Sequence, residues 1–320
     1  MARKVLVTGG AGFIGSHLVS AVLGRGDEVG IVDNFDPFYP ERLKRRALEP
    51  LLAAGARLFT ADIRDAAAMK QAFAETKPEV VVHLAALAGV RPSLERPAEY
   101  MDVNVRGTTV ALEAARDAGT RRFVLASSSS VYGAHGEAPF KETARIDSPA
   151  SPYAASKVAS ETIARTFHNL YGTEVASLRF FTVYGPRQRP DLAIHKFSRR
   201  MLLGQPFPFF GDGSTRRDYT WIDDIIAGVL AACEAPLRYD TFNLGGAHTT
   251  SLRELVSLLE DALGVKAKLD KKPEQPGDMP LTSADVSHAH AVLGYSPSTP
   301  ISVGIKKFAA WVQGEGRDWV

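Results

Sequence analysis

The chain has 320 residues, of which 45% are hydrophobic and 23% are charged, a composition that argues against disorder, collagen-like repeats and coiled coil. It is long enough for one large domain or two modest ones. Its 38 Lys and Arg residues nearly balance its 36 Asp and Glu residues, and the net charge of +2 provides no whole-protein field that would attract nucleic acid or an anionic membrane.

Short β-branched runs alternate with longer amphipathic stretches from residue 4 to about residue 180. This rhythm is typical of βαβ units and predicts a doubly wound parallel sheet covered by helices on both faces. The predicted strands cover residues 5–8, 29–33, 57–60, 80–84, 122–127 and 175–179, and the predicted helices cover residues 13–25, 66–75, 98–118 and 153–171.

The character of the sequence changes after residue 180, where prolines and glycines interrupt shorter elements. We therefore expect a first domain over 1–180 and a smaller, mixed α/β lobe mainly over 181–320. A long apolar helix at 222–235 and a strand at 241–244 indicate that about 221–247 cross back into the first domain.

A glycine-rich turn follows the first predicted strand, with Gly9, Gly12 and Gly15 opening the first predicted helix. Such glycines permit a tight turn and let a pyrophosphate approach backbone N–H groups at the positive end of a helix. Alone, the spacing would also fit an ordinary flexible connection. Asp33, at the end of the second strand, strengthens the dinucleotide interpretation, because a carboxylate there accepts from an adenosine ribose and repels a 2′-phosphate. We expect NAD rather than NADP.

Other strand ends belong to the same predicted cofactor site, because a parallel sheet binds its ligand at the carboxyl ends of its strands. The third predicted strand is followed by Asp62 and Ile63, and the fourth ends in Leu84, Ala85 and Ala86. We expect the cofactor also to contact Phe13, Ile14 and Asn34.

Tyr153 and Lys157 begin the predicted helix over 153–171 and share a face of it, one turn apart. A phenol with an ordinary pKa near 10 is a poor base at neutral pH. A nearby ammonium and a positively charged nicotinamide would both stabilise the phenolate, and Lys157 can supply the ammonium. For this spacing alone, an ordinary surface pair is the better interpretation.

Three motifs together resemble the extended short-chain dehydrogenase/reductase family, specifically its nucleotide-sugar 4-epimerases. They are the glycine turn, the Ser-Ser-Ser-Ser-Val-Tyr-Gly run at 127–133 and the Tyr-x-x-x-Lys pair. The resemblance covers essentially the whole chain. It implies an NAD-binding Rossmann fold in which Tyr153 is the catalytic base, with Lys157 as its partner and a ribose ligand. It also implies that the Ser128 hydroxyl bonds the reacting oxygen and that Asn104 lies near the cofactor and the tyrosine-bearing helix.

The implied reaction is a transient oxidation at carbon 4 of a UDP-sugar, followed by rotation of the 4-keto sugar and return of hydride to its opposite face. Related dehydratases and decarboxylases carry an acidic residue beside the catalytic hydroxyl, where this chain has Ser129 and Ser130. Because no carboxylic acid stands there, epimerisation is the expected reaction.

The Phe-Phe-Thr-Val-Tyr-Gly-Pro-Arg-Gln-Arg-Pro-Asp segment at 180–191 resembles the UDP-glucuronate-specific branch of the epimerases. Thr182 and Arg189 would then face the substrate carboxylate together with Ser129 and Ser130. Segments 33–39 and 88–91 resemble the same branch, which implies a substrate contact for Arg91. The resemblance also implies uracil, diphosphate and ribose contacts for Phe209, Arg217 and Asp278, respectively.

Alternatives remain open for the substrate and for the activity itself. A UDP-glucose/UDP-galactose 4-epimerase differs by one substrate carboxylate, although Gln275 stands where galactose epimerases commonly have Arg. Arg189 would also fit a surface charge in a proline-bounded loop. A decarboxylase without its usual acid would release carbon dioxide, and a non-catalytic NAD-binding regulatory protein would need only the fold.

The sequence also leads to expectations about cellular location and oligomeric state. A single cysteine, Cys233, allows no internal disulfide and fits a reducing compartment, so we expect a cytoplasmic protein without a metal site. No apolar run reaches the roughly 20 residues that span a bilayer, and strand-like residues from position 4 leave no room for a signal peptide. The family pattern implies a homodimer in which helices 98–118 and 153–171 pair with their copies.

Overall fold

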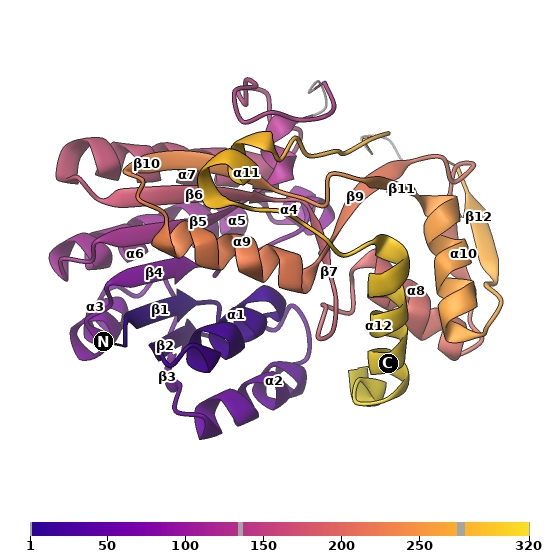
Figure 1. Cartoon of the computed structure of the whole chain (residues 1–320), viewed down its shortest axis with the longest axis horizontal. Helices are drawn as coiled ribbons and strands as arrows, with labels where there is room; N and C mark the ends of the chain where they lie inside the picture. Colours follow the sequence, from indigo (N-terminus) through magenta and orange to yellow (C-terminus); the bar gives the residue numbers. More distant parts are fainter. Residues whose placement is uncertain (1, 134–136, 274–278, 320) are drawn as a thin grey trace.

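A seven-stranded sheet forms the centre of the computed structural model, which describes residues 2–133, 137–273 and 279–319 (Figure 1). The strand order is β10-β6-β5-β4-β1-β2-β3, and every neighbouring pair is parallel. The predicted doubly wound α/β fold is thereby confirmed. Its strands are β1 (Lys4–Thr8), β2 (Glu28–Asp33), β3 (Arg57–Thr60), β4 (Val80–His83), β5 (Arg122–Ser128), β6 (Glu174–Phe180) and β10 (Tyr239–Leu244).

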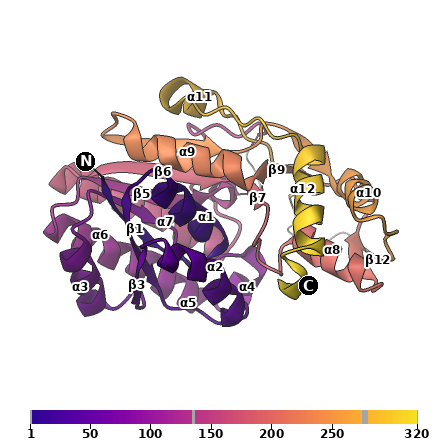
Figure 2. The same cartoon turned by 60° about the horizontal axis from the view of Figure 1, so that its bottom comes forward.

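Alternate side chains of the central strands enter two separate cores. Val80 and Val82 of β4 belong to one hydrophobic cluster, whereas Val81 belongs to the other. This period of two explains why a continuous apolar run marks a strand buried on both faces. Figure 2 shows the two helical layers. One contains α1 (Phe13–Gly24), α2 (Glu41–Ala53) and α9 (Ile222–Glu234), and the other contains α3 (Ala66–Thr76), α6 (Gly107–Asp117) and α7 (Pro152–Tyr171).

The single helix predicted over 98–118 is wrong in its geometry. The structure has α5 (Pro97–Tyr100), a π-helical segment over Met101–Arg106, and then α6. The widened turns accompany a buried side chain, Asn104, whose amide bonds the backbone of Leu87 in the neighbouring loop. Such departures from α-helical geometry are frequent at functional sites.

Helix α2 was also missed by the sequence analysis. Its last turn contains Pro50, and proline normally argues against a helix interior.

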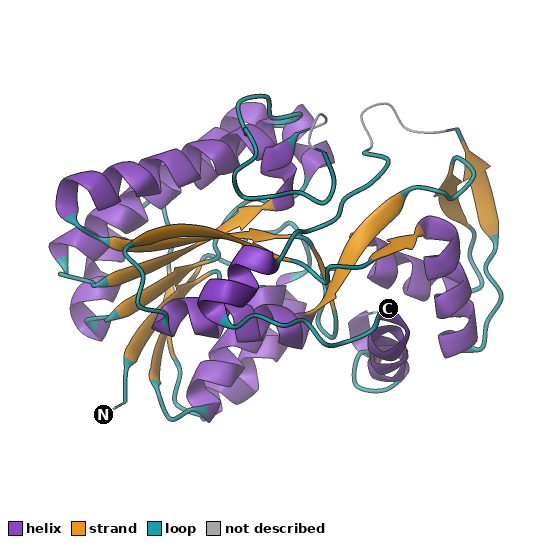
Figure 3. Ribbon diagram, turned by 45° about the horizontal axis from the view of Figure 1, so that its top comes forward, coloured by secondary structure: helices purple, strands orange, loops and turns teal. Residues whose placement is uncertain are grey.

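The remaining elements form a second lobe beside the carboxyl ends of the strands (Figure 3). One sheet of this lobe has the order β11-β9-β7, and the other pairs β12 with β8. Its strands are β7 (Thr182–Tyr184), β8 (Phe207–Phe210), β9 (Arg216–Trp221), β11 (Thr249–Ser251) and β12 (Leu269–Lys272). Its helices are α8 (Ala193–Leu202), α10 (Leu252–Leu263) and α12 (Ile301–Gln313).

Shorter helices complete the chain: α4 (Val90–Glu95), α11 (Ser287–Leu293) and the 3₁₀ turns Ser129–Tyr132 and Arg317–Trp319. Strand β10 pairs in parallel with β6, so it adds to the central sheet although it follows β9 of the second lobe.

The division into domains 1–180 and 181–320, with its crossing segment, stays a prediction. Across the part of the chain that the structure describes, no helix combines the length and apolar character needed to cross a bilayer.

Candidate active site

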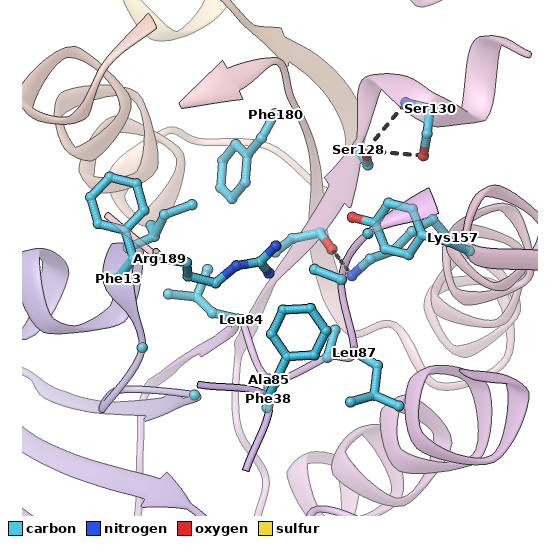
Figure 4. A pocket seen from close by; sticks show the side chains of 18 of the residues that line it. Phe13, Phe38, Leu84, Ala85, Leu87, Ser128, Ser130, Lys157, Phe180 and Arg189 are labelled. Carbon is cyan, nitrogen blue, oxygen red and sulfur yellow. Dashed lines mark hydrogen bonds between the residues drawn. The ribbon is translucent and has the colours of Figure 1, made fainter. Parts of the chain in front are cut away.

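A cavity of about 620 Å³ lies between the carboxyl ends of the central strands and the second lobe (Figure 4). It brings together most of the residues that the sequence singled out, although they come from distant parts of the chain. The predicted residues that line it are Gly9, Gly12, Phe13, Ile14, Gly15, Asp33, Asn34, Asp62, Ile63, Leu84, Ala85, Ala86, Arg91, Ser128, Ser129, Ser130, Tyr153, Lys157, Thr182, Arg189 and Arg217.

The glycine turn connects β1 to α1 at one end of this cavity. Gly12 is the N-cap of α1 and makes no side-chain cap bond, so the first backbone N–H groups of the helix need other acceptors. Gly9 has a φ of 73°, and a Cβ on Gly15 would lie 2.1 Å from the Gly9 carbonyl oxygen. The turn therefore requires glycine at both positions, and it forms a cradle suited to a pyrophosphate.

Asp33 ends β2 and is buried beside the turn. Its Oδ2 accepts from the Ala11 N–H at 2.9 Å and its Oδ1 accepts from the Phe35 N–H at 2.8 Å. Burial raises the pKa of Asp33, whereas these bonds and the positive charge of Lys44 lower it. Each carboxylate oxygen has a second lone-pair site, so Asp33 can still accept from a ribose hydroxyl.

Asp62 lies next along the same wall and is held by a residue that the sequence did not single out. Arg64 Nη2 donates to Asp62 Oδ2 at 2.8 Å, and this side-chain bonding lowers the pKa of Asp62 to about 2. Asn34 Nδ2 donates to the same oxygen at 3.0 Å. Two carboxylates, a glycine cradle and the apolar stretch Leu84–Ala86 therefore fit a dinucleotide.

Tyr153 and Lys157 enter the cavity because α7 begins at Pro152. Ser151 is its N-cap, and the Ser151 hydroxyl accepts from the Ala154 N–H at 3.1 Å. Proline fits the first turn of a helix, where no intrahelical acceptor is lost. Ser128 ends β5 beside the Tyr153 phenol, and its hydroxyl oxygen accepts from the Ser130 N–H at 3.2 Å.

Burial sets the acid–base character of the pair. It raises the pKa of the Tyr153 phenol, whereas a hydrogen bond with Ser128 and the charge of Arg189 lower it. Burial also lowers the pKa of Lys157 to about 8. Lys157 Nζ lies 6.0 Å from the centre of the Tyr153 ring and donates to the Ala126 carbonyl at 2.8 Å. The main contacts that oppose burial of the phenol are thus Ser128 and Arg189, where the sequence had indicated Lys157.

Asn104 lies behind the cavity wall. Its Nδ2 donates to the Leu87 carbonyl and to Ser156 Oγ, both at 2.9 Å, and its Oδ1 accepts from the Leu87 N–H at 2.8 Å. Since Ser156 precedes Lys157 on α7, Asn104 joins the loop after β4 to the helix that carries Tyr153.

Arg189 reaches into the cavity from the second lobe (Figure 4). Its Nε and Nη2 donate to the two carboxylate oxygens of Asp191 at 3.1 and 2.9 Å, and its guanidinium carbon lies 4.9 Å from the centre of the Phe38 ring. Asp191 and Phe38 therefore fix one edge and one face of the guanidinium, leaving the Nη1 edge for a ligand. The sequence alone did not indicate that Asp191 and Phe38 hold the Arg189 guanidinium.

The remaining predicted contacts are more scattered. Phe209 is buried in the core and does not line the cavity, whereas the neighbouring Phe210 lies against Arg91, whose guanidinium carbon is 5.6 Å from its ring centre. Arg217 Nη1 donates to the Met279 carbonyl at 2.6 Å. Asp278 lies outside the described residues. Within the described ranges, no group of three His, Cys, Asp or Glu side chains is arranged to hold a metal ion.

Comparison with known proteins identifies the family. The model of the NAD dependent epimerase/dehydratase family matches residues 5–245. The chain belongs to this family. It is an enzyme family, and the match confirms the resemblance on which the predicted NAD-dependent chemistry rests.

Three similar proteins illustrate the likeness. UDP-glucuronate 4-epimerase 3 of Arabidopsis thaliana is 42% identical, over 97% of this chain and 76% of the relative. The structure of UDP-glucuronic acid 4-epimerase from Bacillus cereus, in complex with UDP-glucuronic acid and NAD, has a TM-score of 0.90 at 35% identity and covers 97% of this chain and 99% of that one. UDP-glucose 4-epimerase from Thermotoga maritima, with UDP-glucose, has a TM-score of 0.89 at 34% identity, over the same shares of the two chains.

The glycine turn yields a direct prediction for cofactor affinity. Gly15→Ala should weaken NAD binding by tenfold or more, about 1.4 kcal/mol, because the added methyl group cannot fit against the Gly9 carbonyl unless the turn opens. Titration calorimetry measures the affinity. Gly24→Ala, in the same helix, is the matched control, since no other group lies within 4 Å of a Cβ built there. Equal NAD affinity for the two variants would contradict the assignment of this turn to the pyrophosphate.

Proposed function

We propose that this protein is an NAD-dependent UDP-glucuronate 4-epimerase, which interconverts UDP-glucuronate and UDP-galacturonate. The observation that carries the proposal is the arrangement of one cavity, in which Ser128, Tyr153 and Lys157 face a supported arginine, Arg189. The named relatives support the same conclusion, since several of them are UDP-glucuronate 4-epimerases.

Tyr153 is the group that accepts the proton of the substrate 4-hydroxyl. The Ser128 hydroxyl lies beside the phenol and lowers its pKa, so both groups can bond one substrate oxygen. The ammonium of Lys157 is held against the Ala126 carbonyl and contributes positive charge nearby. Bound NAD supplies a reversible hydride acceptor in this family. Tyr153 retains the proton while carbon 4 is a ketone and returns it when the hydroxyl is restored.

NAD would be held by the groups that end the central strands. Asp33 suits the adenosine ribose, the N–H groups at the start of α1 suit the pyrophosphate, and Lys157 suits the second ribose. The remaining cofactor contacts in this proposal line the cavity wall and are Phe13, Ile14, Asn34, Asp62, Ile63, Leu84, Ala85 and Ala86. Asn104 lies behind this wall, where it bonds Leu87.

Recognition of the uronate carboxylate is part of the chemistry as well as of specificity. The 4-keto uronate is a β-keto acid and can lose carbon dioxide, so the carboxylate has to be bound without a readily transferred proton nearby. The hydroxyls of Ser129, Ser130 and Thr182 and the guanidinium of Arg189 meet this requirement, because arginine stays protonated at any working pH. Arg91, Arg217 and Asp278 remain proposed contacts for the rest of the UDP-sugar, whereas the burial of Phe209 in the core argues against its predicted uracil contact.

Other functions are less well supported. A UDP-glucose/UDP-galactose 4-epimerase is the main alternative, because the Thermotoga maritima enzyme is nearly as similar in structure. Arg189 favours the uronate, since an uncharged hexose offers no carboxylate to the guanidinium edge that Asp191 leaves uncovered. The presence of Ser128, Tyr153 and Lys157 in one cavity counts against a non-catalytic regulatory protein, and the absence of an acid at Ser129 and Ser130 counts against a decarboxylase.

We also propose a cytoplasmic homodimer. Helices α6 and α7 pack side by side, and Met101, Leu170 and Tyr171 in and beside them are exposed apolar side chains. A second copy placed on these helices would form a four-helix interface. A monomer in sedimentation at micromolar concentration would exclude the dimer, and recovery of the enzyme outside the cytosolic fraction of the source cells would exclude the location.

Removal of the proposed base gives the first functional test. Tyr153→Phe should reduce epimerisation at least about a thousandfold, within the range that general acid–base catalysis provides. UDP-glucuronate affinity should stay within a few fold, because only one hydroxyl is lost. Product formation is followed by NMR and affinity by calorimetry. Substantial retained turnover would show that another group is the base.

Substrate selectivity tests the role of Arg189. Loss of a charge-assisted contact costs roughly 1.5–3 kcal/mol, so Arg189→Ala should lower kcat/KM for UDP-glucuronate about tenfold to a hundredfold. Any kcat/KM for UDP-glucose should change much less. Arg106→Ala, which removes an exposed arginine paired with Asp102, is the control. An equal loss for both substrates would make Arg189 a scaffold residue and remove the main support for the uronate.

A further inference from the structure

A buried ion pair joins helix α7, which carries Tyr153 and Lys157, to strand β6, the neighbour of the strand that ends in Ser128. Glu161 of α7 and Arg179 of β6 have side-chain exposures of 6% and 4%, and Arg179 Nε and Nη2 donate to the two carboxylate oxygens at 3.0 and 2.8 Å. Neither residue lines the active-site cavity. A buried pair is a weak source of stability, because desolvation of the two ions offsets most of their attraction. Net stability therefore does not explain why an ion pair is buried at this position.

The pair is connected to the catalytic residues through two elements. On α7, Glu161 lies one turn after Lys157, on the same face. On β5, the Ser127 hydroxyl donates to Glu161 Oε1, and Lys157 Nζ donates to the carbonyl of Ala126. Residues 126 and 127 of β5 are thus held by two side chains of α7, immediately before Ser128.

Glu161 also provides a negative charge that acts on the buried ammonium of Lys157. Burial lowers the pKa of Lys157 to about 8, and Glu161 is the charge that opposes this shift. The other titratable groups facing Lys157 are Tyr153 and His83, and burial lowers the pKa of His83 to about 3, so His83 is neutral at working pH.

The surroundings of Arg179 hold the Glu161 carboxylate in place. Arg179 Nη1 donates to the Tyr132 hydroxyl at 3.0 Å and to the Glu142 carbonyl at 3.3 Å. Burial raises the pKa of Tyr132 to about 12, so the phenol is neutral and adds no competing charge. The guanidinium is thus fixed by β6 and its neighbours and presents its Nε and Nη2 edge to Glu161.

We propose that Glu161, fixed by Arg179, is a positioning residue that keeps the ammonium of Lys157 charged and held against strand β5 beside Ser128 and Tyr153. The inference rests on the proposed catalytic roles of these three residues. Glu161 would act through Lys157 and would contact neither substrate nor cofactor.

The test is the pH dependence of kcat in Glu161→Gln. Removal of the carboxylate charge favours the neutral form of Lys157, so the alkaline limb of the kcat profile should move to lower pH by about one unit. At pH 9, kcat should then fall about tenfold further than at pH 6, while KM for UDP-glucuronate stays within about twofold. A merely structural role would lower the yield of folded protein and leave the limb in place.

A second variant keeps the test decisive if Glu161→Gln does not fold, since that variant leaves Arg179 buried without its partner. The double variant Glu161→Gln/Arg179→Gln contains no unpaired charge and should shift the limb in the same direction, by less than Glu161→Gln because the positive charge of Arg179 is lost as well. Its matched control is Glu174→Gln/Arg122→Gln. That pair joins β5 to β6 at the start of both strands, with Nη2 and Oε2 2.6 Å apart, and makes no contact with Lys157 among the described residues.

The outcomes separate this inference from the proposed function. An alkaline limb that stays in place in the Glu161 variants, or that moves equally in the control, overturns the inference. If Tyr153→Phe is inactive while the limb stays in place, only the role of Glu161 is lost. If Tyr153→Phe remains active, the proposed catalytic assignment itself fails.

Discussion

Burial of the Tyr153 phenol is the physical constraint on which the proposed site depends. A phenol removed from water resists ionisation, yet it has to accept a proton during the proposed reaction. The structure surrounds Tyr153 with groups that oppose the effect of burial: the Ser128 hydroxyl at the end of β5 and the Arg189 charge from the second lobe. The parallel sheet and helix α7 together determine this arrangement, because they place the end of β5 and the first turn of α7 beside each other at one cavity.

Burial of the Tyr153 phenol also connects the proposed recognition of the substrate carboxylate with the proposed proton transfer, because Arg189 takes part in both. Arg189 contributes positive charge near the phenol and is also the group proposed to bind the uronate carboxylate. Asp191 and Phe38 restrict its position, so its free edge is presented to the cavity before a ligand arrives. A bound carboxylate would in turn reduce the effect of Arg189 on Tyr153, which gives the buried ammonium of Lys157 a larger share of phenolate stabilisation in the complex.

Sequence reasoning reached the sheet and most of the cavity because these features depend on local patterns. Apolar strands, the spacing of Gly9, Gly12 and Gly15, and Asp33 at a strand end can all be recognised without tertiary contacts. Ser128, Tyr153 and Lys157 required the family resemblance, since a Tyr and a Lys one turn apart occur on many helix surfaces. Their meeting in one cavity is a consequence of the fold.

The features that were missed depend on contacts between distant segments. The π-helical segment around Asn104 accompanies bonds to Leu87 and Ser156, and Arg64 was not marked by any motif. The Glu161–Arg179 pair joins a helix to a strand, so neither residue is distinctive by itself. Phe209 was singled out by the sequence but does not line the cavity. Side chains alternate along β8, so Phe209 points into the core and the adjacent Phe210 lies against Arg91.

The central claim is that one cavity breaks and remakes the bond between carbon 4 and its hydrogen by hydride transfer. UDP-glucuronate labelled with deuterium at carbon 4 tests this most directly, with the product examined by NMR in ordinary water. UDP-galacturonate should keep the deuterium at carbon 4, because a hydride held on the bound cofactor does not exchange with solvent. Product that carries solvent hydrogen at carbon 4 would show that the bond breaks by loss of a proton, and it would contradict hydride transfer in this cavity.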